Sequence, residues 1–181
     1  MAARAGEGDK TAWDALVDRY GNLVWSVARS FRLDNATAAD VSQTTWLRLV
    51  ENLDRIRDPE RLAGWLATTA RNEALRVVRR TQRELPAVDI EVLTDPVFVE
   101  PMAAILADER GAELLEVFNE LSHDCQQLLR LATADPPLEY AEIADLLDRP
   151  IGSIGPSRAR CLKQMRTRLE AISARTQGET R

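Results

Sequence analysis

The chain has little of what most catalytic and metal sites are built from. It contains one histidine, His123, and two cysteines, Cys125 and Cys161, which do not form a CxxC pair. These are too few nitrogen and sulfur ligands for a zinc site, so we expect neither a metal nor another cofactor. The sequence also lacks a GxSxG motif and a glycine-rich phosphate loop, and no paired carboxylates mark a pocket. We therefore predict that the protein is not an enzyme.

Long apolar stretches are also absent. No run approaches the ~20 apolar residues that span a bilayer, and the N-terminal MAARAGEGDK has no apolar core of the kind that secretory signals carry. We expect a cytoplasmic protein without a membrane-inserted segment. That compartment is reducing, which disfavours a disulfide without excluding one, and we interpret both cysteines as small residues in or near the core.

Signals for β-strands are weak. Aromatic residues make up 5% of the chain, and no alternating run is bounded by hairpin turns. Apolar residues instead recur at spacings of three and four, which is typical of amphipathic helices. The clearest stripe consists of Trp13, Leu16, Val17, Tyr20, Val24, Val27, Ala28 and Phe31. The sequence therefore predicts an all-α fold.

Small polar residues mark where several of these helices are expected to begin. Thr37 and Ser122 precede apolar-periodic segments, and each can accept a hydrogen bond from a free N–H of the first turn. Ser153 is expected to cap the last helix. Pro156 would then occupy the third helical position, where no backbone donor is needed.

Residues 84–100 interrupt the helical pattern. They include Pro86 and Pro96 and carry five acidic residues and no basic one. We interpret them as an extended acidic linker between two small helical domains, residues 1–83 and residues 101–176. The alternative is a solvated acidic loop.

Positive charge gathers in two blocks, although the whole chain has a net charge of −5. One block, Arg71 to Arg83, ends the predicted third helix, and the other lies in residues 149–181, which carry eight basic and two acidic residues. Salt screens electrostatic interactions beyond about 8–10 Å. A DNA duplex therefore responds to these local basic blocks rather than to the net charge of the whole chain.

The segment 138–168 is a helix-turn-helix candidate. A short helix, a tight turn containing glycine and a longer basic helix follow one another, with no acidic residue between positions 157 and 169. The first turns of such a helix enter the major groove, where arginine can bond guanine edges. The alternative interpretation is a solvated basic face on a structural helix.

The earlier basic block lies downstream of Trp46 and Trp65. Aromatic rings beside arginines suit single-stranded DNA, because bases stack on the rings and guanidinium groups hold the backbone. Equally, the tryptophans can belong to the core while the arginines complement a helix C-terminus.

Together the two halves resemble the extracytoplasmic-function branch of the sigma-70 family. The stretch ATAADVSQTTWLRLV, residues 36–50, resembles the family's polymerase-binding helix, and RLAGWLATTARNEALRVVRR, residues 61–80, resembles its promoter-melting helix. The stretch YAEIADLLDRPIGSIGPSRARCLKQMRTRL, residues 140–169, is similar to its helix-turn-helix. Two departures, Trp46 in place of Phe and the segment 154–157, leave the base preference open.

The resemblance implies a sigma factor that binds core RNA polymerase and directs promoter-specific initiation. A stand-alone helix-turn-helix regulator is the alternative.

The implied partners are core RNA polymerase and promoter DNA. Many relatives are held inactive by an anti-sigma factor, which makes such an antagonist a candidate partner here. The implied polymerase-binding residues are Asp40, Gln43, Thr44, Leu47 and Arg48. Residues implied to hold the melted upstream element are Arg57, Arg61, Trp65, Arg71, Asn72, Arg76, Arg79 and Arg80. Those implied to read the farther duplex element are Ser157, Arg158, Arg160, Lys163 and Arg166.

Overall fold

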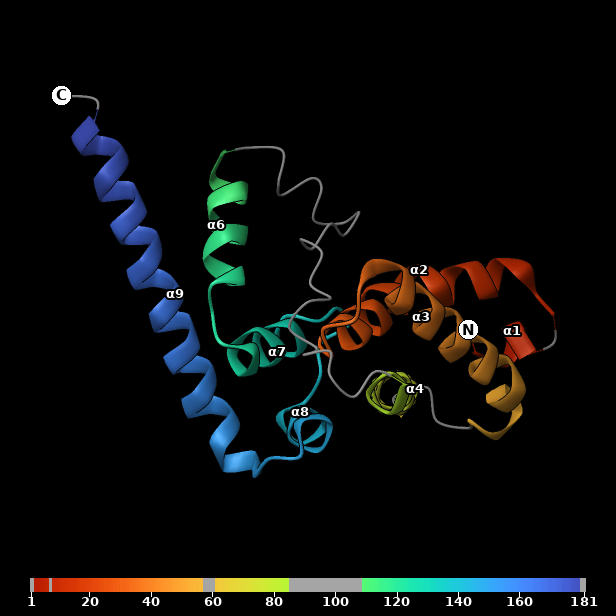
Figure 1. The fold of residues 1–181 in the computed structure, drawn as a ribbon. Coiled ribbons are helices and arrows are strands. Elements are labelled where there is room, and N and C mark those ends of the chain that lie inside the picture. Colours follow the sequence, from red (N-terminus) through yellow and green to blue (C-terminus); the bar gives the residue numbers. More distant parts are fainter. Residues whose placement is uncertain (1, 7, 57–60, 85–108, 180–181) are drawn as a thin grey trace.

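A computed structural model describes the chain except for residues 1, 7, 57–60, 85–108 and 180–181 (Figure 1). Every regular element in the described part is helical, which confirms the all-α prediction. The elements are α1 (Ala2–Gly6), α2 (Lys10–Arg29), α3 (Asn35–Asn52), the 3-10 turn η1 (Leu53–Arg55), α4 (Leu62–Glu84), α6 (Glu109–Asn119), α7 (His123–Ala132), α8 (Tyr140–Leu147) and α9 (Ile151–Glu179). The predicted acidic linker lies outside the described residues, except for Glu84, which is the last residue of α4.

The first half is built on α2, α3 and α4, which pack against one another. Asp9 caps α2 by accepting hydrogen bonds from the amides of Thr11 and Ala12, at 3.0 and 3.2 Å. The cap of α3 is Asp34, not the predicted Thr37. The Asp34 carboxylate accepts from the Thr37 amide and hydroxyl, both at 2.8 Å, because a carboxylate three residues upstream reaches the free donors of the first turn.

The second half is a helix-turn-helix flanked by α6 and α7. Ser122 caps α7 as predicted, with its hydroxyl accepting from the amide of Cys125. In α8, the Glu142 carboxylate accepts from the backbone N–H of Glu139 at 2.8 Å, so the first turn has its own cap.

The turn into α9 differs from the prediction. Asp148, not a glycine, takes the left-handed conformation at the end of α8, with φ of 53°. Helix α9 begins at Ile151, so Gly152 and Ser153 lie inside it and Pro156 is its sixth residue rather than its third. The Ser153 hydroxyl donates back to the carbonyl of Pro150. The three residues 148–150 suffice for the turn because Asp148 tolerates a positive φ.

The expectation of two free cysteines is wrong. Cys125 of α7 and Cys161 of α9 form a disulfide, with their Cα atoms 5.4 Å apart. Both residues are buried, as predicted. The reducing power of a compartment affects how long a disulfide survives. It does not decide whether the fold brings two cysteines within bonding distance.

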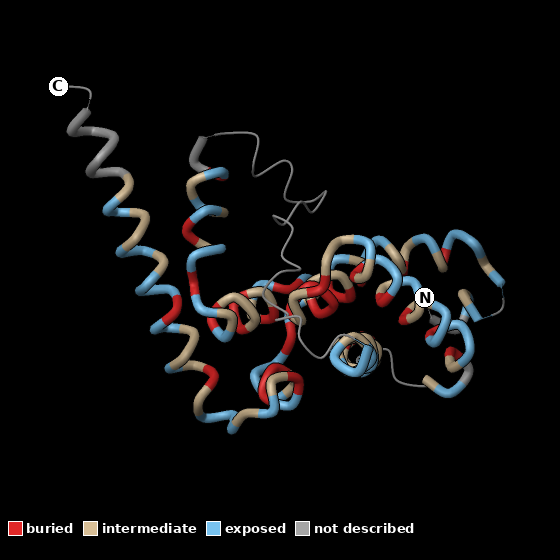
Figure 2. The backbone as a smooth tube through the Cα atoms, in the orientation of Figure 1, coloured by how far each residue is buried: buried red, intermediate tan, exposed pale blue. Residues whose placement is uncertain are grey.

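The two halves share one apolar core (Figure 2). Its buried members run from Leu16 and Leu23 in α2 through Leu66 in α4 to Leu128 in α7 and Ile143 in α8. Contacts of α2 with α7 and of α4 with α8 form the seam between the halves. None of the helices in the described part of the chain is long and apolar enough to cross a membrane.

Candidate nucleic-acid interface

The basic face of α9 is open to solvent. Arg160, Lys163 and Arg166 are exposed and recur every three residues, so their side chains follow one side of the helix. Within the described chain no hydrogen bond or ion pair engages any of the three. Their charges are therefore available to a negatively charged ligand such as a DNA backbone.

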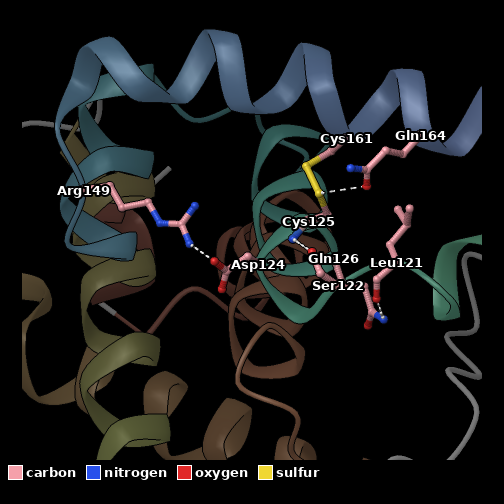
Figure 3. Close-up of a disulfide and its surroundings, with 8 residues drawn as sticks. All are labelled: Leu121, Ser122, Asp124, Cys125, Gln126, Arg149, Cys161 and Gln164. Carbon is pink, nitrogen blue, oxygen red and sulfur yellow. Dashed lines mark hydrogen bonds and ion pairs between the residues drawn. A yellow bond between two sulfur atoms is a disulfide. The ribbon is translucent and has the colours of Figure 1, made fainter.

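The first turns of α9 are held by α8 and α7. Ile154 is fully buried in the core, and the Nη1 of Arg158 lies 3.4 Å from the hydroxyl of Tyr140 on α8. In the turn before α9, Arg149 forms a 2.6 Å ion pair with Asp124 in the first turn of α7 (Figure 3). Ser157 is half-buried beside Arg158. These contacts hold the start of α9 in a fixed orientation, as groove reading requires.

On α4 the predicted arginines divide into two groups. Asn72, Arg76, Arg79 and Arg80 are exposed, and of these Arg76 makes a 3.3 Å ion pair with Glu73. Arg71 instead turns toward the second half, where its Nε donates a 2.8 Å hydrogen bond to the carbonyl of Leu146. The exposed group forms a cationic strip along the second half of α4, and Arg71 is not part of it in this arrangement.

The upstream end of this surface is less completely described. Trp65 is partly buried and packs against the core, which agrees with the alternative interpretation of this ring as a core residue. Arg61 is exposed at the start of α4. Arg57 lies outside the described residues.

A second surface lies on α3. Asp40, Gln43, Leu47 and Val50 are all exposed and share one face of the helix. Leu47 and Val50 are each 58% exposed, whereas Val41, Thr45 and Leu49 face the core. Two large exposed aliphatic side chains on a polar face are typical of a protein-binding surface.

The remaining predicted residues of α3 make internal contacts. The Thr44 hydroxyl donates to the carbonyl of Asp40 at 2.8 Å. Arg48 pairs with Glu51 at 3.0 Å and with Glu73 of α4 at 3.6 Å. Arg48 therefore also joins α3 to α4.

A cationic cluster at the seam, formed by Arg29, Arg32, His123 and Arg130, was not predicted from the sequence. His123 is half-buried there, and burial followed by the charge of Arg32 lowers the pKa of its imidazole below 6.5. The guanidinium of Arg130 lies 4.8 Å from the centre of the Phe118 ring. Burial and then the nearby Arg29 lower the pKa of Arg130 to about 10, so it stays protonated near neutrality. A single histidine in the sequence does not indicate such a cluster, because the cluster forms only when α2 and α7 pack together.

Comparison with known proteins identifies the family. The family model for sigma-70 region 2 matches residues 16–84. The chain is 27% identical over 164 residues to the RNA polymerase sigma-H factor of Pseudomonas aeruginosa, covering 85% of this chain and 84% of that protein. It is 24% identical over 163 residues to the ECF RNA polymerase sigma-E factor of Escherichia coli, with the same coverage. Residues 16–84 are therefore a sigma-70 region 2, and over most of its length the chain is similar to extracytoplasmic-function sigma factors.

Solved structures share the fold of this sigma factor. The sigma factor RpoE, solved in complex with the anti-sigma factor NepR from Bartonella quintana, aligns with a TM-score of 0.63 and 23% identity over 87% of this chain and 97% of that one. CnrH, solved in complex with the cytosolic domain of CnrY, aligns with a TM-score of 0.57 and 23% identity over 94% and 95% of the two chains. The helical order of both halves is thus a known sigma-factor fold.

Proposed function

We propose that this sigma factor binds core RNA polymerase through the exposed face of α3 and directs it to promoters with two DNA surfaces. Asp40, Gln43, Thr44, Leu47 and Arg48 form or support the polymerase contact. The exposed pair Leu47 and Val50 supports this assignment, since burying them against a partner would be favourable.

The DNA surfaces are the cationic strip of α4 and the basic face of α9. The strip, with Asn72, Arg76, Arg79 and Arg80, holds the melted upstream element. Arg57, Arg61, Trp65 and Arg71 are its further contacts, and Arg71 would have to turn from Leu146 or use its remaining donors to join them. Ser157, Arg158, Arg160, Lys163 and Arg166 read or hold the farther element as duplex. The observation that carries the proposal is the exposed, internally unpaired series Arg160, Lys163 and Arg166 on the second helix of a helix-turn-helix.

The domain organisation follows the same division of labour. Residues 1–83 act on polymerase and melted DNA, residues 101–176 act on the duplex, and residues 84–100 connect them. The protein acts in the cytoplasm, where polymerase and the nucleoid are, and it performs no chemistry of its own. An anti-sigma factor is a further proposed partner, supported by the RpoE structure, which was solved with one.

Run-off transcription tests the proposal. Core polymerase with this protein should give promoter-specific transcripts from a genomic promoter library, and core polymerase alone should not. The double variant Arg79→Ala/Arg80→Ala should lose most of this activity because two phosphate-holding charges are removed. Lys10→Ala is the matched control, since Lys10 is exposed on α2 and pairs only with Asp14 among the described residues. Tight sequence-specific DNA binding without core polymerase, together with no transcripts, would support a stand-alone regulator instead.

A further inference from the structure

The Cys125–Cys161 disulfide encloses α8, the turn and the first part of α9. It joins α7 to α9 across 36 positions of sequence. The loop that it closes contains most of α7, all of α8, the turn 148–150 and α9 as far as Cys161. Figure 3 shows the bond between the two helices, with Gln164 on α9 beside it. The bond therefore fixes the helix that carries Arg158, Arg160 and Lys163 to the body of the molecule.

Helix α9 has few other anchors. Among its described side chains, only Ile154 and Cys161 are buried, and Met165 packs partly against the core. Farther along, Arg168 pairs with Glu120 at 3.2 Å, but both side chains are largely exposed, and such pairs hold weakly. The covalent link lies between Ile154 and this ion pair, in the middle of the DNA-facing part of the helix. Its loss would leave that part held by Ile154, the partly buried Met165 and the contact of Arg158 with Tyr140.

Exchange with small thiols and disulfides requires a local opening of α9, because both cysteines are buried. Cys125 and Cys161 retain 7% and 5% of their exposure, and the Cys125 Sγ lies 3.9 Å from the Oε1 of the exposed Gln164. In a compartment whose thiols are kept reduced, disulfides are usually transient and redox-sensing.

We propose that Cys125 and Cys161 form a reversible redox pair that controls how firmly α9 is held, with the disulfide form as the DNA-reading form. The role in DNA reading rests on the proposed function, whereas the redox pair itself does not. The oxidant is a low-molecular-weight disulfide such as glutathione disulfide. One cysteine thiolate attacks it, forming a mixed disulfide and releasing one small thiolate. The second cysteine thiolate then displaces the other, so the two protein thiols are oxidised and the small disulfide is reduced to two thiols.

The full-length chain alone tests the redox pair. The protein is equilibrated in glutathione buffers of graded potential and its free thiols are counted after denaturation. The oxidised form should have no free thiols and the reduced form two, and the change should be reversible. The reduced form should melt about 10 °C lower than the oxidised form, because opening the loop releases chain entropy in the unfolded state. Amide exchange should become faster in α9 and stay unchanged in α3. The proposal fails if the disulfide does not re-form, or if both forms have the same melting temperature and the same exchange in α9.

Transcription with core polymerase tests the consequence for DNA reading. If α9 is correctly placed in about one third of the reduced molecules, promoter-specific transcripts should fall about threefold on reduction. Cys125→Ala/Cys161→Ala is the control and should give one transcript level in both buffers, which separates the effect from any redox response of the polymerase. Equal transcript levels from the oxidised and reduced wild type would overturn the link to DNA reading. If neither form gives transcripts while the thiol and exchange results hold, the proposed function is wrong and the redox pair stands.

Discussion

The Nε of Arg71 in α4 donates a 2.8 Å hydrogen bond to the carbonyl oxygen of Leu146, which lies 75 residues later in the last turn of α8. The last carbonyls of a helix have no partner within the helix, and Arg71 supplies one here. A guanidinium assigned to melted DNA therefore joins the two halves in this arrangement. If Arg71 holds DNA, it either releases this hydrogen bond or uses the remaining donors of its guanidinium.

Gly64→Ala should weaken this seam. A methyl group at Gly64 would lie 2.3 Å from the Oε1 of Glu142, and the other oxygen of that carboxylate holds the amide of Glu139. Moving the carboxylate away should cost about 1 kcal/mol in the free energy of unfolding, the usual worth of a helix cap. Gly21→Ala is the control: nothing lies within 4 Å, so alanine should stabilise α2 by roughly 0.5–1 kcal/mol. Urea denaturation measures both, and equal stabilisation by the two variants would contradict the account of the seam.

Leu47→Ser/Val50→Ser should reduce polymerase binding without unfolding the protein. Both side chains are largely exposed, so the free energy of unfolding should change by less than about 0.5 kcal/mol per site. Affinity for core polymerase should fall by at least about tenfold, because two aliphatic contacts would be lost. Leu49→Ala on the buried face is the opposite case and should destabilise the fold by about 2–5 kcal/mol. If the variant competes with a second sigma factor for core polymerase as well as the wild type does, α3 is not part of the interface.

Arg160→Ala should weaken recognition of the farther promoter element. Arg160 is exposed near the start of α9 and makes no internal ion pair in the described structure, so its loss should leave the fold intact. If it reads a base, binding should fall by ~1–3 kcal/mol on the matching sequence only. A uniform loss on all sequences would assign it to a phosphate. Arg168→Ala is the control, because Arg168 pairs with Glu120 and should affect DNA affinity little. Footprinting of holoenzyme on promoter variants distinguishes these outcomes.

Acidification should destabilise the seam through His123. Burial and the cations Arg32 and Arg130 lower the pKa of the folded imidazole below 6.5, while Asp124 opposes them. As the pH falls below 6.5, the unfolded chain takes up the proton first, so the free energy of unfolding decreases until the folded pKa is passed. His123→Asn should flatten this dependence between about pH 7.5 and 5.5, as measured by denaturant titration. A wild type whose stability is constant over that range would refute the effect.

Much of the helical fold was accessible from the sequence. The apolar stripe from Leu16 to Val27 predicted the buried face of α2, because a helix that packs on one side repeats its apolar residues every three or four positions. The Ser122 cap was also predicted correctly. The buried face of α3 is less evident from the sequence: Leu47 and Val50 are apolar but exposed, and the core takes Val41, Thr45 and Leu49. The spacing of apolar residues along a helix does not specify which of them a neighbouring helix will bury.

The sequence alone determined the all-α class, the order of the helices and the places where basic side chains accumulate, since these depend on local periodicity and on charge. Tertiary structure alone decided that Cys125 meets Cys161, that Arg71 turns to Leu146, and that His123 lies among arginines. Each of these relationships joins residues from different helices. They depend on how the helices pack in three dimensions, and no local pattern in the chain encodes that packing.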